Sequence, residues 1–311
     1  MKKTCDFNDI KNIIGAIKQT EHSWRINTPS RLKALVNVND YSEYGLQSAG
    51  TRLNFPAKWI SEALYPTEPK LTERVLRARY KAYLEKENNG LLIRDFNGKH
   101  YGVLTNKYSI FDDDEIVDII KDNDYLMNAE EFWYDITPER CHMRFISGNK
   151  LTIPGEDSPL SMCVFIDNSM VGKSAFKIRF GIYRWACTNG MIADLKEFTI
   201  VKEKHMGKKD YSQIVAEALE DIPKYEIMLM DMVKNAMTTK SSIYSLSDED
   251  AIAKIKDKLN VGRKESAKII DFYKAYGGES KWDLINAITD YAHKFNVDKR
   301  VELESKALKV A

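Results

Sequence analysis

The amino-acid sequence predicts an α+β protein, with a central antiparallel sheet over about residues 90–205 between N-terminal and C-terminal helices. Apolar residues recur at helical spacing early in the chain, alternate at every second position in the middle, and return to helical spacing after about residue 210. We expect three parts that pack as one large domain: a helical part over residues 1–88, a sheet-containing core over 89–206 and a helical part over 207–311.

The first part is predicted to be helical because its apolar residues share one face of a helix. The stretch "LTERVLRARYKAYLEKENNG" places Leu76, Tyr80 and Leu84 together, and Gly90 suits the end of such a helix.

The middle part carries strand signals. Asn97-Gly98 lies between two apolar runs and suits the positive φ angles of a tight hairpin turn. Alternating apolar residues indicate two later strands: Met162, Val164 and Ile166, then Phe176, Ile178 and Phe180. Lys177 and Arg179 then lie on the opposite face of the second strand, and Asn189-Gly190 is a turn signal after it.

The last part shows helix starts. Ser247 with Asp250, and Ser280 with Asp283, form capping-box patterns in which an acid replaces the usual Glu. Pro223 is expected to kink a long helix or to start a second one.

The composition is that of an ordinary globular protein. The net charge of +1 gives no attraction of the whole molecule to nucleic acid or membrane, and no apolar run is long enough to span a bilayer. The chain has four cysteines, Cys5, Cys141, Cys163 and Cys187, and none has the spacing of a metal site. We therefore expect free thiols and a cytoplasmic location.

Charge is distributed unevenly. Residues 111–139, the acidic segment, carry eleven acids against Lys121, whereas residues 173–210 carry nine bases against four acids. The basic stretch is either a solvated sheet face or a track for DNA phosphates. The DNA interpretation uses six residues for phosphate contact or base stacking: Lys173, Lys177, Arg179, Arg184, Tyr108 and Trp185.

Catalytic motifs are weak. Cys187 has no histidine in a cysteine-protease context, so a packing role is favoured. Gly172-Lys173-Ser174 resembles the end of a P-loop, but Asp167 stands where the first glycine belongs. The "DDDE" acids suit a helix start better than a magnesium site. We therefore predict no catalytic residues, metal or cofactor.

Several motifs resemble the phage- and plasmid-associated proteins that carry domain of unknown function 932. The resemblance lies in "NKYSIFDDDEIVDII", "FIDNSMVGKSAFKIRFGIYRWACTNGM" and "SKWDLINAITDYAHKF". Its motif positions are Asn168, Ser169, Gly172, Arg184, Cys187, Asn189, Gly190, Trp282, Asn286, Ala287, Thr289 and Tyr291.

The resemblance implies a mobile-element protein without a defined reaction. By analogy of fold with single-strand annealing proteins of the Red-beta and Erf type, it suggests a homo-oligomer that binds single-stranded DNA and assists recombination. Two alternatives stay open. One is a nucleotide- or anion-binding enzyme, in which the Asn-Ser and Cys-Thr-Asn-Gly turns converge. The other is a host-directed interaction protein that uses the acidic segment.

Overall fold

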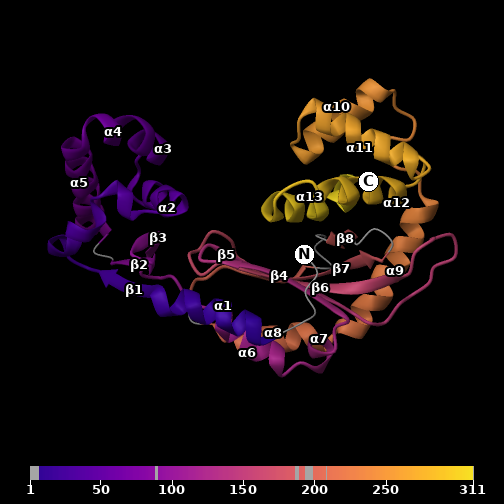
Figure 1. Ribbon diagram of the computed structural model, residues 1–311, viewed down its shortest axis with the longest axis horizontal. Helices are drawn as coiled ribbons and strands as arrows, with labels where there is room; N and C mark the ends of the chain where they lie inside the picture. The colour runs from indigo at the N-terminus through magenta and orange to yellow at the C-terminus, as the bar shows by residue number, and fades with distance from the viewer. Residues whose placement is uncertain (1–6, 88–89, 186–188, 193–198, 208, 311) are drawn as a thin grey trace.

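The computed structural model describes residues 7–87, 90–185, 189–192, 199–207 and 209–310. Figure 1 shows an N-terminal unit at the left, a large sheet in the centre and a group of C-terminal helices at the upper right. The predicted fold class is confirmed, because helices flank sheets whose strands all pair antiparallel.

The N-terminal unit contains a three-stranded sheet, in the order β1-β2-β3, covered by helices. The hairpin prediction is confirmed, since Asn97 and Gly98 adopt φ of 50° and 73° between β2 and β3. The prediction of a mostly helical part over residues 1–88 did not include β1, whose pairing partner β2 comes much later in the chain. The elements are α1 (Phe7–Thr20), β1 (Glu21–Ile26), η1 (Pro29–Leu35), η2 (Val38–Asp40), α2 (Glu43–Leu53), α3 (Ala57–Trp59), η3 (Ile60–Leu64), α4 (Tyr65–Thr67), α5 (Pro69–Glu87), β2 (Leu91–Phe96) and β3 (Lys99–Thr105).

The central sheet has the order β4-β5-β6-β7-β8, and β9 also pairs with β7. The predicted alternation is confirmed, because the apolar residues of β6 and β7 join the main core while Arg179 faces the other side. Asn189 and Gly190 open strand β8 and pair with the end of β7, so the prediction of a turn at these two residues is wrong. The strands are β4 (Glu131–Thr137), β5 (Arg140–Ile146), β6 (Leu160–Asn168), β7 (Phe176–Arg184), β8 (Asn189–Ile192) and β9 (Thr199–Glu203).

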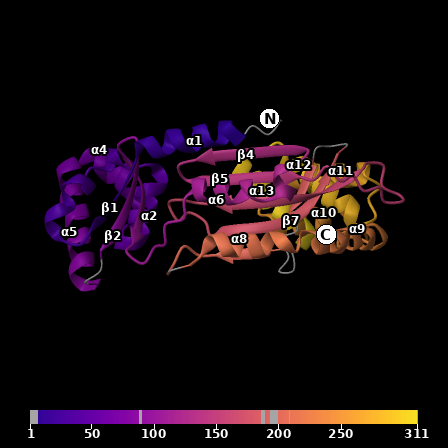
Figure 2. The ribbon, with the colours of Figure 1, turned by 90° about the horizontal axis from the view of Figure 1, so that it is seen from below.

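Helices cover both faces of this sheet. Figure 2, seen from below, shows α6 and α8 on one face, and Figure 1 shows α13 above the other. On that upper face, Val301 of α13 packs against a small cluster that includes Phe165 and Tyr183. The helices are α6 (Asp113–Lys121), α7 (Asp124–Met127), α8 (Tyr211–Glu220), α9 (Ile222–Thr238), α10 (Asp248–Leu259), α11 (Arg263–Ala275), α12 (Lys281–Ala292) and α13 (Val297–Val310).

The predicted helix starts are confirmed. Ser247 accepts a hydrogen bond from the backbone of Asp250, Ser280 and Asp283 form a capping box, and Pro223 lies in the first turn of α9. Among the described residues, no helix combines the length and apolar character needed to cross a membrane.

Candidate functional site

Arg179, one of the expected phosphate contacts, lies in the protein interior. It is 3% exposed beneath α13, where Nη1 donates to Ser305 Oγ at 2.7 Å and Nη2 forms an ion pair with Asp167. Lys177, the next cation on this face, is half-buried and lies opposite Lys202 in the strand pairing. The geometry gives Arg179 a structural task, tying β7 to α13, in place of the expected phosphate contact.

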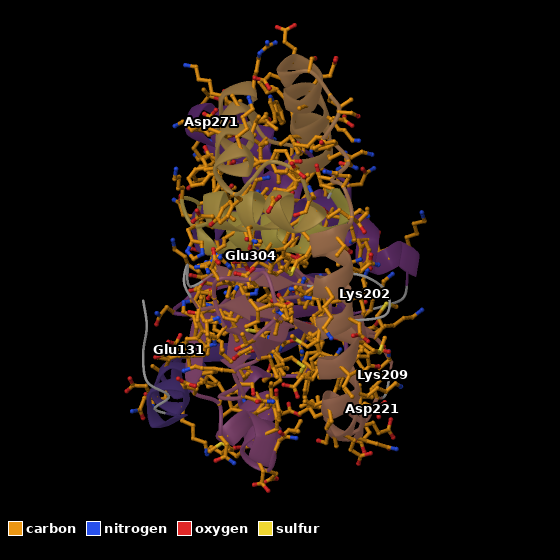
Figure 3. The ribbon with its side chains drawn as sticks, turned by 90° about the vertical axis from the view of Figure 1, so that its right-hand side faces the viewer. Glu131, Lys202, Lys209, Asp221, Asp271 and Glu304 are labelled. Atoms are coloured by element: carbon orange, nitrogen blue, oxygen red, sulfur yellow. The ribbon has the colours of Figure 1, made fainter. Side chains whose placement is uncertain are left out.

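A second buried arginine ties α13 to the sheet. Arg144 Nη2 donates to Glu304 Oε2 at 2.6 Å, and Arg300 Nε donates to the other carboxylate oxygen at 2.8 Å. Glu304 is fully buried between α13 and the sheet (Figure 3). The guanidinium of Arg144 also lies 4.7 Å from the centroid of the Phe165 ring. Opposite charges buried together neutralise each other, so this contact fixes the position of α13.

A row of charged groups continues from Arg179 along the sheet. His142 Nδ1 lies 2.5 Å from Asp167 Oδ1, and its Nε2 lies 3.4 Å from Asp298 Oδ1. Burial lowers the pKa of His142, but the two carboxylates more than offset burial and raise it overall. Burial alone would raise the pKa of Asp167, yet Arg179 and His142 hold it well below its usual range. Asp298 also binds Arg140 Nη1 at 2.5 Å, so positive and negative groups alternate along the row.

Three further residues of the expected DNA surface have partners within this chain. Lys173 Nζ pairs with Glu139 at 2.8 Å, the Tyr108 hydroxyl donates to a backbone oxygen 2.9 Å away, and Trp185 Nε1 donates to Ser161 Oγ at 2.9 Å. Most of the predicted DNA-binding side chains are therefore engaged with other residues of this chain.

The Asn-Ser motif joins the end of β6 to the start of α6. Asn168 Nδ2 donates to Asp113 Oδ1 at 2.8 Å and to the backbone oxygen of Phe111 at 3.0 Å. Burial raises the pKa of Asp113 to about 7. Ser169 Oγ accepts from the Lys173 backbone at 2.9 Å and so closes the turn that contains Gly172. Two of the family-like motifs thus meet here, in a buried and structural arrangement.

The acids at the start of α6 are balanced by cations of this chain. Asp112, Asp114 and Glu115 offer oxygens within 4.8 Å of one another, which would suit a metal ion. However, Lys18 Nζ lies 2.5 Å from Asp114 and 3.6 Å from Asp112, and Arg94 Nη2 lies 2.7 Å from Asp112. Two acids of the acidic segment, Asp112 and Asp114, are therefore paired with cations of this chain.

The Asn-Ser pair lies far from Arg184, the described side chain of the second expected turn. Asn168 ends β6, whereas Arg184 ends β7 and pairs with Leu160, the first residue of β6. Eight steps along a strand at 3.3 Å each separate the two ends by roughly 26 Å. The described residues of the two motifs therefore do not come together in the expected nucleotide or anion site. Cys187 lies outside the described residues, and only the strand backbone of Asn189 and Gly190 is described.

Two other family-like motifs do converge, on Glu156. Arg184 Nε donates to Glu156 Oε1 at 2.7 Å, and Trp282 Nε1 donates to Oε2 at 2.5 Å. Asn286, one turn further along α12, lines the same pocket. Sequence reasoning did not single out Glu156, since a lone acid in a loop carries no local signal.

A different basic surface lies on α5. Four exposed cations with helical spacing form one line along this helix, here called the α5 stripe: Lys70, Arg74, Arg77 and Lys81. Lys81 lies 3.8 Å from the exposed carboxylate of Glu85. Lys70, Arg74 and Arg77 have no ion-pair partner in the part of the chain that the structure describes. The sequence also shows the spacing of these four cations, but the helix was predicted from its apolar face alone.

Comparison with known proteins places most of this architecture in one family. A family model described as Domain of unknown function (DUF932) matches residues 100–310, which is more than half of the chain. The chain belongs to the DUF932 family. No curated protein and no solved structure matches it.

The DUF932 match includes the whole central sheet and the Glu156 site. It begins within β3, so α5 and most of the N-terminal unit lie outside it. The family description gives no reaction, so proposals about function must rest on the geometry of this chain.

Proposed function

We propose that this protein binds single-stranded DNA through the N-terminal unit, with the α5 stripe as the phosphate contact. The observation that carries the proposal is the exposure of Lys70, Arg74 and Arg77, which have no ion-pair partner among the described residues. Lys173, Arg179 and Arg184, which the sequence analysis placed on the DNA surface, each pair instead with an acid of this chain.

Charge favours this surface over the rest of the molecule. Residues 21–107 carry 14 Lys and Arg against nine Asp and Glu, a net charge of +5 in a chain whose total is +1. The α5 stripe spans twelve residues, and its two ends lie about 16 Å apart at helical rise, over which one strand in B-form geometry places about five phosphates. Binding would release counterions from these phosphates and would therefore be sensitive to salt.

An exposed aromatic residue supports single strands as the ligand. Trp59 of the same unit is 52% exposed, although tryptophan is seldom this accessible in a folded protein. Unpaired bases stack on such rings, whereas bases in a duplex are already stacked. Strand annealing and assembly into a homo-oligomer stay predictions that rest on the family resemblance.

The test removes the α5 stripe with the changes Lys70→Gln, Arg74→Gln, Arg77→Gln and Lys81→Gln. We expect the affinity for a single-stranded 30-mer, measured by fluorescence anisotropy, to fall at least tenfold at low salt. The slope of log K against log salt should become shallower by about 3, since each single-strand phosphate contributes about 0.7.

A matched control neutralises four exposed lysines of the C-terminal helices: Lys256→Gln, Lys258→Gln, Lys264→Gln and Lys268→Gln. It has the same net charge and should keep the affinity and the salt slope of the unmodified protein. Equal losses in both variants, or no loss in the α5 variant, would contradict the proposal. Trp59→Ala should weaken binding to the single strand while leaving duplex binding unchanged.

A further inference from the structure

A pocket of about 470 Å³ lies around the Glu156 site, at the end of the sheet remote from the N-terminal unit. Its walls come from the loop before β6, the ends of β7 and α9, and the start of α12. The chemistry of this lining is independent of the DNA-binding proposal.

The wall at Glu156 is rigid. Besides the bonds from Arg184 and Trp282, Glu156 Oε1 accepts from the Ser158 backbone at 3.1 Å, and its side chain is 3% exposed. A carboxylate that accepts three such hydrogen bonds on its two oxygens holds one position. The pocket is therefore preformed on this side.

One polar side chain in the lining lacks a partner. Asn286 is 4% exposed, and its side-chain amide has no hydrogen bond to any residue that the structure describes. The Asn286 amide is not among the fully buried polar atoms that lack a partner, so it meets solvent inside the pocket. An amide can donate two hydrogen bonds and accept two, so it offers both kinds of contact to a ligand that enters the pocket.

The charge of the lining selects the ligand. Arg184 balances Glu156, and Lys240 Nζ balances Glu279 at 2.6 Å. Two acids are left, Asp157 and Asp283. Asp283 accepts two backbone N–H groups at the start of α12, whereas Asp157 is exposed with no ion-pair partner among the described residues.

We propose that the pocket binds a small organic cation of the polyamine class. Its ammonium groups would pair with Asp157 and donate to the oxygen of Asn286, and its apolar stem would lie against Tyr276 and Trp282. Phosphates and nucleotides are disfavoured, because the acids outnumber the bases in the lining.

Isothermal titration of the full chain without DNA tests this proposal, with spermidine, putrescine, magnesium, inorganic phosphate and AMP as probes. We expect spermidine to bind with one site per chain, and magnesium, phosphate and AMP to bind at least tenfold more weakly. Asp157→Asn and Asn286→Ala should each weaken spermidine binding at least fivefold while circular dichroism shows an intact fold.

Asp271→Asn is the matched control, because Asp271 is exposed on α11 and does not line the pocket (Figure 3). It should bind spermidine like the unmodified protein. The proposal is overturned by a lack of spermidine binding, by tighter binding of AMP or phosphate, by unchanged affinity in both pocket variants, or by an equal loss in the control. Failure here would leave the DNA assays of the α5 stripe unaffected, so the two proposals fail separately.

Discussion

Asp113→Asn is expected to make the protein more stable at pH 8 and to flatten the dependence of its stability on pH. The side chain is fully buried, and its pKa is raised from 3.8 to about 7. The folded state therefore holds a proton that the unfolded chain releases near pH 4, and stability falls as the pH rises from about 4 to about 7. Between pH 5 and pH 8 this one group should remove about 3 kcal/mol from the free energy of unfolding.

An asparagine retains the contact that matters. Asn168 Nδ2 can still donate to Oδ1 at position 113. The new amide supplies a donor where Asp113 Oδ2 has no partner, next to Asn168, whose Oδ1 also lacks one among the described residues. Asparagine at position 113 thus offers the hydrogen-bond donor and acceptor of the protonated acid, but it has no proton to lose as the pH rises.

Urea unfolding at pH 5 and pH 8 measures the effect, with Asp271→Asn as the control. Other groups contribute to the pH dependence of stability in this range, because the pKa of His142 is raised in the fold and burial lowers the pKa of His205 to about 4. Their contributions are shared by the variant and the unmodified protein, so they cancel in the comparison. If the Asp113 variant kept the pH dependence of the unmodified protein, the proposed protonation of Asp113 in the fold would be disproved.

Local patterns predicted most of the elements. Asn97-Gly98 identified its hairpin because a tight turn demands positive φ at both residues, which these two tolerate. The alternation of Phe176, Ile178 and Phe180 identified β7 and placed Arg179 on its other face. Strand β1 escaped prediction, because its pairing with β2 is a contact between distant segments.

The position of Arg179 could not be predicted for the same physical reason. The alternation showed which way Arg179 points, but not that α13 covers that face more than a hundred residues later and supplies Ser305. Arg179, which was expected at the surface, is therefore enclosed between β7 and α13. Arg184 was predicted as a phosphate contact and also matched the family motif, but its partner Glu156 could not be predicted, because the pairing joins a loop to the end of β7 and to α12.

Glu304→Ala is expected to lower the free energy of unfolding by about 3–5 kcal/mol, because it leaves the buried charge of Arg144 without its partner. Arg144 is 5% exposed and loses the carboxylate that lies 2.6 Å from it. Arg300, which is at the surface side of the same carboxylate, can turn to water. The main cost should therefore come from Arg144, and α13 should loosen from the sheet. Chemical denaturation and hydrogen exchange of α13 measure both effects.

Two further variants separate charge burial from general damage to the helix. Glu302→Ala removes an acid from the same helix whose side chain is 39% exposed between Lys299 and Lys306, and exposed pairs contribute only about 0–1 kcal/mol. The double change Arg144→Met with Glu304→Leu removes both buried charges. It should restore most of the lost stability, because no buried charge is then left without its partner. A double variant as unstable as Glu304→Ala would show that the shape of the side chains, and not the balance of charge, holds α13 in place.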